Sequence, residues 1–450
     1  MSFYNIIFKP KKGGLYGNAR MMSPRQIRRY FQRKCKGICL DGVRFLKPEY
    51  TKLNTVVISP TGGGKSTLLK TIILQKIKQY LHSFWVIDPA SDIWRDTHRW
   101  LESQGFHVKV VNLDDASKSL KINVLLVVSK TANGIEDLAS LLILIQYDGT
   151  KKGDPFWSDS AEIILTLLMR AVVSPTQNEY PKNLHTVYML LNWFGASPEK
   201  LDRFILTHLK SNQRLKEEYK SLVANSSDNS KMLLSIVSTA KSAIAKLVNN
   251  ETIGEIISDD TFEIETLRQK PQAIFIQVRE DRLSNSGVKA MLSIINKFLM
   301  AQCMELPKQG EEQLEVHAYI DEAGAFYLQN LESYIVTMRK RAVSIMLFFQ
   351  SLEQLDMYGI SQKKVILNNC LNKLIFPSVS TETALWASAL LGNQTKELGE
   401  NRPVGVPLLS AQQICELPKQ SFLYIHKNKA TILKTKPWYK QFKLKRRSKL

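Results

Sequence analysis

Short apolar runs alternate with longer stretches of helical spacing along the first quarter of the chain. The runs at 54–58, 83–89 and 107–113 are rich in Val, Ile, Phe and Trp, and they have the length of buried strands. The stretch 66–81, which follows the first run, has the periodicity of a helix. Buried strands that alternate with helices are typical of a parallel sheet, so the pattern predicts an α/β fold.

The pattern changes between residues 154 and 258, where nearly every stretch has helical spacing. Apolar helices are predicted there at 160–173, 196–210 and 229–248. Strand-like runs then resume at 273–278, 316–320, 343–349 and 373–378. We therefore expect an α/β core with a mostly parallel central sheet, interrupted by an all-α insertion domain.

These changes divide the chain into five parts. Residues 1–53 form a lead-in with a helix at 23–34, where Ser23 is the expected N-cap and Pro24 the first helical residue. The other parts are the first piece of the sheet domain (54–153), the all-α domain (154–258), the second piece of the sheet domain (259–426) and a C-terminal tail (427–450).

Composition favours a protein of the cytosol. Hydrophobic residues make up 44% and charged residues 23% of the chain, as in ordinary globular proteins. No apolar run approaches the ~20 residues of a membrane span, and the N-terminus lacks the charge order of a signal peptide. The five cysteines are scattered. The close pair in CKGIC (35–39) has no further ligands at metal spacing, so free thiols are expected.

The net charge of +21 lies at the two ends. Residues 1–52 carry thirteen Lys or Arg and two acids, and residues 419–450 carry eleven and no acid. Basic ends favour a polyanion as partner, either nucleic acid or an anionic membrane surface, although a solubilising fringe has the same composition. Trp438, Tyr439 and Phe442 lie among the C-terminal cations and favour stacking on a nucleic-acid strand.

The stretch SPTGGGKST stands between a predicted strand and a predicted helix. Phosphate-binding loops need small residues whose N–H groups surround the phosphates, a lysine for the β- and γ-phosphates, and a hydroxyl for Mg²⁺. Lys65 and Ser66 supply the last two, and Ser59 replaces the first glycine of the strict pattern with another small residue. We therefore expect ATP and Mg²⁺ as cofactors, bound by Ser59, Pro60, Thr61, Gly62, Gly63, Gly64, Lys65, Ser66 and Thr67.

Two later strands end in residues that suit ATP hydrolysis. VHAYIDEAG (316–324) ends in Asp321, predicted to hold the metal, and Glu322, predicted to accept a proton from the attacking water. The next strand ends in Gln350, a candidate sensor of the γ-phosphate. The alternatives are an exposed acid pair and a structural glutamine. A loop, an acid pair and a glutamine on successive strands describe a RecA-like P-loop NTPase core.

Arg339 belongs to a basic cluster in front of that strand. Such an arginine can complete the site of a neighbouring subunit as an arginine finger. A solvated basic turn is the alternative for MRKRA (338–342).

Taken together, these segments resemble one family over nearly the whole chain. The chain is similar to the type IV secretion coupling proteins, the TraG/TraD-like conjugative DNA-transfer ATPases of the FtsK/HerA group. The segments that carry the resemblance are YGNARMMSPRQIRRYF and GICLDG within 16–42, SPTGGGKST (59–67), WVIDPASDI (85–93), KINVL (121–125), PFWSDSAEIILTLLMRAVV (155–173), YIDEAG (319–324), FFQSLEQLDMYG (348–359) and ILNNCLNKLIFPSVSTETALWASALLG (366–392).

The chain departs from the family pattern in three respects. Family members usually begin with transmembrane helices, and no such segment is found here. Ala90 stands where the family favours a lysine after Asp-Pro, and Val124 stands where a proline usually follows Asn123. None of these changes removes a residue with a predicted role in hydrolysis.

The resemblance implies a homo-hexamer that hydrolyses ATP. It would deliver single-stranded DNA with its relaxase, or other relaxosome proteins, to a type IV secretion channel or a separate membrane subunit. It would work in the cytoplasm, recruited to the cytosolic face of the cell membrane. Two alternatives remain: a double-stranded DNA translocase of segregation or packaging type, and a nucleotide-regulated receptor or adaptor that does not translocate.

Overall fold

The computed structural model describes residues 14–33, 36–75, 81–146, 155–209, 212–224, 230–261, 267–305, 314–398 and 402–450. Several sequence predictions fall partly outside these ranges. They are the first thirteen residues of the lead-in, Cys35 of the close cysteine pair, and the boundary near residue 154. The end of the helix predicted at 66–81 also lies outside them.

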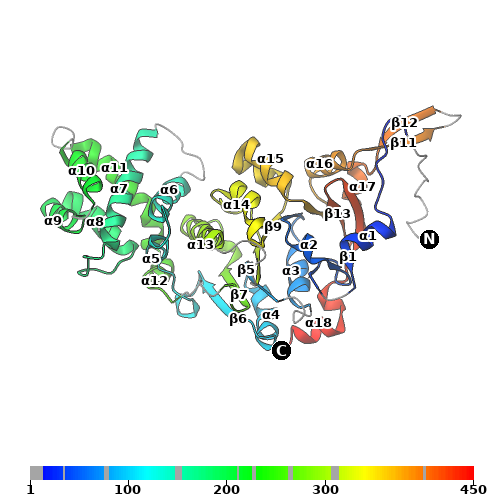
Figure 1. The fold of residues 1–450 in the computed structure, drawn as a ribbon, viewed down its shortest axis with the longest axis horizontal. Coiled ribbons are helices and arrows are strands. Elements are labelled where there is room, and N and C mark those ends of the chain that lie inside the picture. Colours follow the sequence, from blue (N-terminus) through cyan, green and yellow to red (C-terminus); the bar gives the residue numbers. More distant parts are fainter. Residues whose placement is uncertain are drawn as a thin grey trace.

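A single large sheet organises the molecule (Figure 1). Within the described residues it has nine strands, in the order β14-β13-β10-β4-β9-β8-β5-β7-β6. The strands from β10 to β6 run parallel, whereas β13 and β14 are added antiparallel at one edge. Their bounds are β4 Thr55–Ile58, β5 His82–Pro89, β6 His107–Asn112, β7 Gln272–Val278, β8 Glu315–Ile320, β9 Val343–Phe349, β10 Asn372–Ile375, β13 Ser421–His426 and β14 Lys429–Lys434.

Alternate residues of each strand enter different cores, because successive side chains of a strand point to opposite faces. In β4, Val57 packs with helices α3 and α4, while Val56 and Ile58 belong to the core on the other face. Helices therefore cover both faces of the sheet, and the predicted α/β class is confirmed. The covering helices are α3 Lys65–Ile73, α4 Asp92–Ser103, α13 Ser286–Glu305, α14 Leu331–Thr337, α15 Gly359–Asn369, α16 Thr381–Leu391 and α17 Ala411–Cys415.

The predicted all-α insertion is also present and lies beyond the β6 edge of the sheet (Figure 1). It begins before the predicted residue 154, because α5 and α6, which the sequence analysis assigned to the first piece of the sheet domain (54–153), pack with the helices that follow. Its long helix α11 packs against α6, α7 and α8 through buried residues such as Ile236, Ala240 and Ile244, which share one helix face. The helices are α5 Val124–Ser129, α6 Gly134–Gln146, α7 Pro155–Val173, α8 Leu184–Ala196, α9 Pro198–His208, α10 Gln213–Ala224, α11 Ser230–Val248 and α12 Glu251–Ile256.

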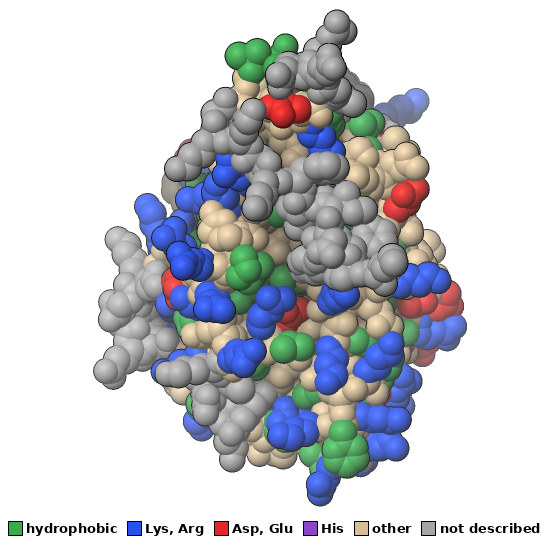
Figure 2. Space-filling view, turned by 90° about the vertical axis from the view of Figure 1, so that its right-hand side faces the viewer, with side chains coloured by type: hydrophobic (Ala, Val, Ile, Leu, Met, Phe, Trp, Pro, Cys, Tyr) green, Lys and Arg blue, Asp and Glu red, His purple; other side chains and the backbone are tan. Residues whose placement is uncertain are grey.

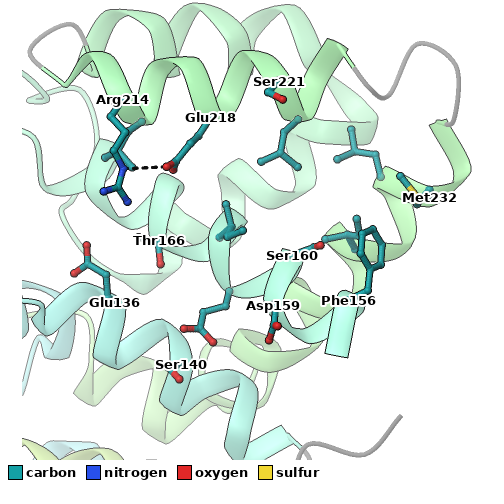
Figure 3. A pocket seen from close by; sticks show the side chains of 16 residues that line it. Glu136, Ser140, Phe156, Asp159, Ser160, Thr166, Arg214, Glu218, Ser221 and Met232 are labelled. Carbon is teal, nitrogen blue, oxygen red and sulfur yellow. Dashed lines mark hydrogen bonds and ion pairs between the residues drawn. The ribbon is translucent and has the colours of Figure 1, made fainter. Parts of the chain in front are cut away.

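A cavity of about 810 Å³ opens between α6, α7, α10 and α11. Figure 3 shows Glu136, Asp159 and Glu218 among its lining side chains, with Phe156 and Met232 at one side. The cavity thus combines an apolar wall with several carboxylates. It is formed by the insertion alone.

The lead-in begins as predicted but its helix is shorter. Ser23 and Gln26 form a capping box, and α1 runs over Pro24–Tyr30. Phe31 then becomes extended, because β1 (Phe31–Gln32) pairs with β3 (Phe45–Leu46) in a small sheet that also contains β2 (Ile38–Cys39). The short helix α2 (Pro48–Thr51) leads into the main sheet.

Four strands near the C-terminus are not among those predicted from the sequence. β11 (Asn393–Leu398) and β12 (Arg402–Pro407) form a separate two-stranded ribbon, and β13 and β14 extend the main sheet. Two short apolar runs, FLYI (422–425) and ATIL (430–433), are separated by the polar stretch 426–429, and this is the signal that would have predicted the β13–β14 hairpin.

The predicted C-terminal tail of 427–450 is corrected by the structure. It contains β14, a 3₁₀ turn (Trp438–Lys440) and helix α18 (Phe442–Arg447), which lies near α3 and α4. Arg447 donates a hydrogen bond to the carbonyl of Leu74 (2.6 Å), and its guanidinium lies 4.2 Å from the ring centre of Trp100. Leu444 is buried. These contacts fix the segment to the body of the molecule despite its charge.

Cations nevertheless remain on the surface of both ends. Figure 2 shows many Lys and Arg side chains on the face to which α1 and α18 belong. Exposed examples are Arg25, Arg28, Arg29, Lys443, Lys445 and Arg446. In the part of the chain that the structure describes, we find no helix with the length and hydropathy needed to span a membrane.

Candidate nucleotide-binding site

The loop 59–64 joins β4 to α3 and has the conformation of a phosphate-binding loop. Gly62 and Gly64 have φ angles of +74° and +108°, which side-chain-bearing residues rarely adopt. A Cβ atom on Gly63 would lie 2.3 Å from the hydroxyl oxygen of Ser59. The loop therefore requires its glycines, and Lys65 begins the helix behind it, whose first N–H groups are free to bind an anion.

Strand order brings the predicted hydrolytic residues to this loop. β9 lies between β4 and β8, and all three strands run parallel. The residues that follow them, namely the loop, Gln350 and the acid pair, therefore meet at one edge of the sheet. Sequence spacing alone does not provide this neighbourhood.

Lys65 and Glu322 are in direct contact. The ammonium nitrogen of Lys65 is 3.2 Å from Oε1 of Glu322 and donates to the carbonyl of Ser59 (3.4 Å). Lys65 is mostly buried, so the ion pair is shielded from solvent. A phosphate that bound Lys65 would compete with Glu322 for the ammonium group.

Gln350 connects the acid pair to the loop. Its side-chain amide donates to Oε2 of Glu322 (3.0 Å), and its amide oxygen accepts from the hydroxyl of Thr61 (3.3 Å). Its own backbone N–H donates to Gln354 (2.7 Å). Gln350 thus forms hydrogen bonds with both the loop and Glu322, so a movement of the loop would change the orientation of Glu322.

Asp321 is buried at the end of β8. Burial, with a smaller contribution from the neighbouring Glu322 carboxylate, raises its pKa to about 7, against the opposing effect of Lys65. A buried carboxylate next to a second acid suits a divalent cation, which would favour the charged form. The hydroxyl of Ser66 and the carboxylate of Asp321 are hard oxygen donors of the kind that Mg²⁺ prefers.

Glu322 itself has a φ angle of +55°. This left-handed conformation is uncommon for a residue with a side chain and often marks a functional position. It follows directly on Asp321, whose carboxylate accepts the N–H of Glu322 (3.1 Å). Asp321 is thus buried, while the next residue, Glu322, is partly exposed and contacts Lys65.

Asp88 is a buried acid for which the sequence predicts no role. It lies at the end of β5, and its oxygens accept the N–H groups of Ile93 (3.0 Å) and Trp94 (2.7 Å) at the start of α4. Burial raises its pKa to about 7. The aspartate of the Asp-Pro segment thus satisfies the free donors of a helix N-terminus, which is a structural role.

Arg339 lies far from the loop of its own chain. It is exposed in the 3₁₀ turn before β9, whereas Gln350 and the loop follow the carboxyl ends of β9 and β4. The seven residues of β9 separate the two ends by about 20 Å. The structure therefore does not bring Arg339 together with the other predicted site residues, and any role in hydrolysis requires a neighbouring subunit.

Comparisons with known proteins agree with this architecture. The family model described as type IV secretory system conjugative DNA transfer matches residues 18–449. No curated protein matches the chain.

Several solved structures share the fold. The bacterial conjugative coupling protein TrwB in complex with sulphate has a TM-score of 0.72 at 16% identity, covering 94% of this chain and 96% of that chain. The plasmid coupling protein TrwB in complex with ADP and Mg²⁺ has a TM-score of 0.71 at 17% identity, covering 94% and 97%. VirB4 of Thermoanaerobacter pseudethanolicus has a TM-score of 0.59 at 12% identity, covering 91% and 99%.

Proposed function

Because this chain belongs to the type IV secretory system conjugative DNA transfer family, we propose that it is the coupling ATPase of a conjugative element. It hydrolyses ATP and uses the energy to deliver single-stranded DNA, with its relaxase, to a type IV secretion channel. The observation that carries the enzymatic part is the cluster of Lys65, Glu322 and Gln350 at a phosphate-binding loop.

Each residue of the cluster has a chemical task in this proposal. The loop amides and Lys65 bind the phosphates, and Ser66 and Asp321 hold Mg²⁺, which neutralises charge on the β- and γ-phosphates. Glu322 accepts the proton of the attacking water once phosphate has taken Lys65 from it. TrwB, which shares the fold, has been solved with ADP and Mg²⁺ and with the ATP analogue ADPNP, which supports the choice of cofactors.

A ring of subunits is part of the proposal. Arg339 is about one strand length from its own loop, so it can act only on the site of a neighbour. A homo-hexamer would place the exposed Arg339 and Lys340 of one subunit against the loop of the next. Recruitment of this ring to the cytosolic face of the membrane belongs to the same proposal.

DNA and relaxase would bind at different places. Exposed cations of α1 and α18 suit the DNA backbone. The cavity of the all-α insertion is lined by Asp159 and Glu162, and by Glu136 and Glu218, which form ion pairs with Arg170 and Arg214. A basic segment of the relaxase or another relaxosome protein would bind there at Asp159, and at Glu136 and Glu218 in competition with these arginines. Charge reversal by Asp159→Lys should reduce relaxase pull-down and leave ATP turnover unchanged, because the cavity is formed by the insertion alone.

The test of the function is the ATPase rate of the purified protein with single-stranded DNA, duplex DNA and no DNA, at two salt concentrations. We expect stimulation by single strands that decreases with salt. Stronger stimulation by duplex DNA would favour a double-stranded DNA translocase. Equal turnover under all conditions would favour a nucleotide-regulated adaptor that awaits its relaxase or a membrane partner.

A further inference from the structure

A second cavity lies on the other side of the phosphate-binding loop. It has a volume of about 480 Å³, within the range of roughly 300–1,000 Å³ that small-molecule sites occupy. The loop residues Thr61–Gly64 form one of its walls, but Asp321, Glu322 and Gln350 do not line it. The loop therefore separates the hydrolytic residues from this cavity.

The cavity continues along one face of α3. Gly64, Thr67, Leu68 and Thr71 line it, and they recur at the spacing of neighbours on a helix. Since Lys65 reaches the β- and γ-phosphates, which must face Glu322, the other end of a bound nucleotide extends away from Glu322. The cavity is the space that this nucleoside end can occupy beside α3.

The opposite wall comes from the end of the chain. Residues Thr435–Pro437 and Tyr439 line the cavity across from α3, together with Phe376. Tyr439 as a residue is 45% exposed, so it is accessible to a ligand. Phe376 is buried and stacks on Phe422 at 5.4 Å, which gives this side a rigid apolar floor.

Hydrogen bonds hold this C-terminal wall in place at two points. The N–H of Lys436 donates to the carbonyl of Asp41 (2.8 Å), and the N–H of Trp438 donates to the hydroxyl of Thr71 on α3 itself (3.2 Å). Asp41 is in turn fixed, because its carboxylate accepts from the N–H of Arg44 and from its guanidinium. A wall anchored in this way is preorganised for a ligand, which reduces the entropy cost of binding.

At the hydrogen bond between Lys436 and Asp41, the two backbone segments are packed too closely to admit a side chain. Gly42 has a φ angle of +78°, and a Cβ atom there would lie 2.1 Å from the carbonyl oxygen of Lys436. A side chain at this position would displace the C-terminal wall.

We propose that the segment Thr435–Tyr439 forms the nucleoside half of the nucleotide site, with the ring of Tyr439 stacking on the base of ATP. This inference rests on the proposed function, because it concerns the same nucleotide. The exposed ammonium groups of Lys419 and Lys436 at the cavity add positive potential near the nucleotide. Stacking tolerates different bases, so adenine and guanine nucleotides bind in the same manner.

The test is calorimetric titration of the full-length protein with ADP and with pyrophosphate, both in the presence of Mg²⁺. Pyrophosphate occupies the loop and has no nucleoside. Tyr439→Ala should weaken ADP binding about tenfold and leave pyrophosphate binding unchanged. Tyr439→Phe keeps the ring and should bind ADP like the wild type. Phe442→Ala, which removes an exposed ring just outside the cavity, is the matched control and should also bind normally.

A second variant tests the position of the segment Thr435–Tyr439 without changing the ring of Tyr439. Gly42→Ala should weaken ADP binding, again with unchanged pyrophosphate binding, because it displaces Lys436. If Tyr439→Ala binds ADP like the wild type, or weakens ADP and pyrophosphate binding equally, the nucleoside assignment is overturned. Failure of the wild type to bind either ligand would instead overturn the proposed function together with this inference.

Discussion

At the scale of single residues, the contact between Lys65 and Glu322 leads us to predict different effects on ATP turnover when each residue is replaced. Lys65→Ala removes the cation that binds the phosphates and should abolish turnover and weaken ATP binding. Glu322→Gln keeps the shape of the side chain but cannot accept a proton at neutral pH. It should bind ATP and turn over roughly 10²–10⁴-fold more slowly. Turnover rates and ATP binding measured side by side check this, and wild-type turnover in either variant would contradict the site.

Gln350 gives a second prediction at this scale, because it contacts both Glu322 and Thr61. Gln350→Ala should lower kcat by roughly 10²-fold, as the removal of a preorganised donor does, and change the affinity for ADP little. Steady-state kinetics and ADP titration separate these effects. Gln354→Ala is a useful comparison, since Gln354 accepts the backbone N–H of Gln350 but does not bond to Glu322 in the structure. An equal decrease of kcat in both variants would indicate a structural role for Gln350.

At the scale of elements, the C-terminal helix α18 is expected to stabilise the helices beside the loop. Arg447→Ala removes a hydrogen bond to Leu74 and the contact with Trp100. Such interactions contribute about 1–2 kcal/mol together, so the free energy of unfolding should fall by that amount. Urea unfolding measures it. Lys449→Ala, an exposed cation in the same segment, serves as the control. Equal stability of the two variants would mean that α18 is not firmly bound.

At the scale of the whole molecule, the two basic ends should be visible in the salt dependence of DNA binding. Arg25, Arg28 and Arg29 are exposed on α1. Replacing all three with alanine should reduce the slope of log affinity against log salt, by about 0.7 for each phosphate of a single strand that is no longer neutralised. Binding of labelled single-stranded DNA at several salt concentrations measures the slope.

A change in affinity with an unchanged slope would show that these arginines do not bind phosphates. Lys130 lies on the helical insertion, far along the chain from either basic end. The variant Lys130→Ala is therefore a control that removes a cation outside the basic ends.

Local features of the protein follow from the order of its residues without any knowledge of the fold. The glycine-rich loop, the acid pair, the parallel strands and the helical insertion were all predicted, because each depends on spacing within a short stretch: the small residues around Gly63, the apolar run ending in Asp321, the helical period of 229–248. The capping of α1 by Ser23 was predicted for the same reason. Such patterns reflect backbone geometry and the separation of apolar from polar faces, which neighbouring residues already specify.

Which distant residues meet, in contrast, depends on how the chain is folded. The position of β9 between β4 and β8 places Gln350 between the loop and Glu322, and the β13–β14 hairpin returns the chain so that Tyr439 reaches the cavity beside α3. A stretch rich in lysine, read alone, resembles a solvated tail. Buried Leu444, the bond from Trp438 to Thr71 and the contact of Arg447 with Trp100 outweigh that local preference. They join residues hundreds of positions apart, and no local periodicity encodes such a pairing.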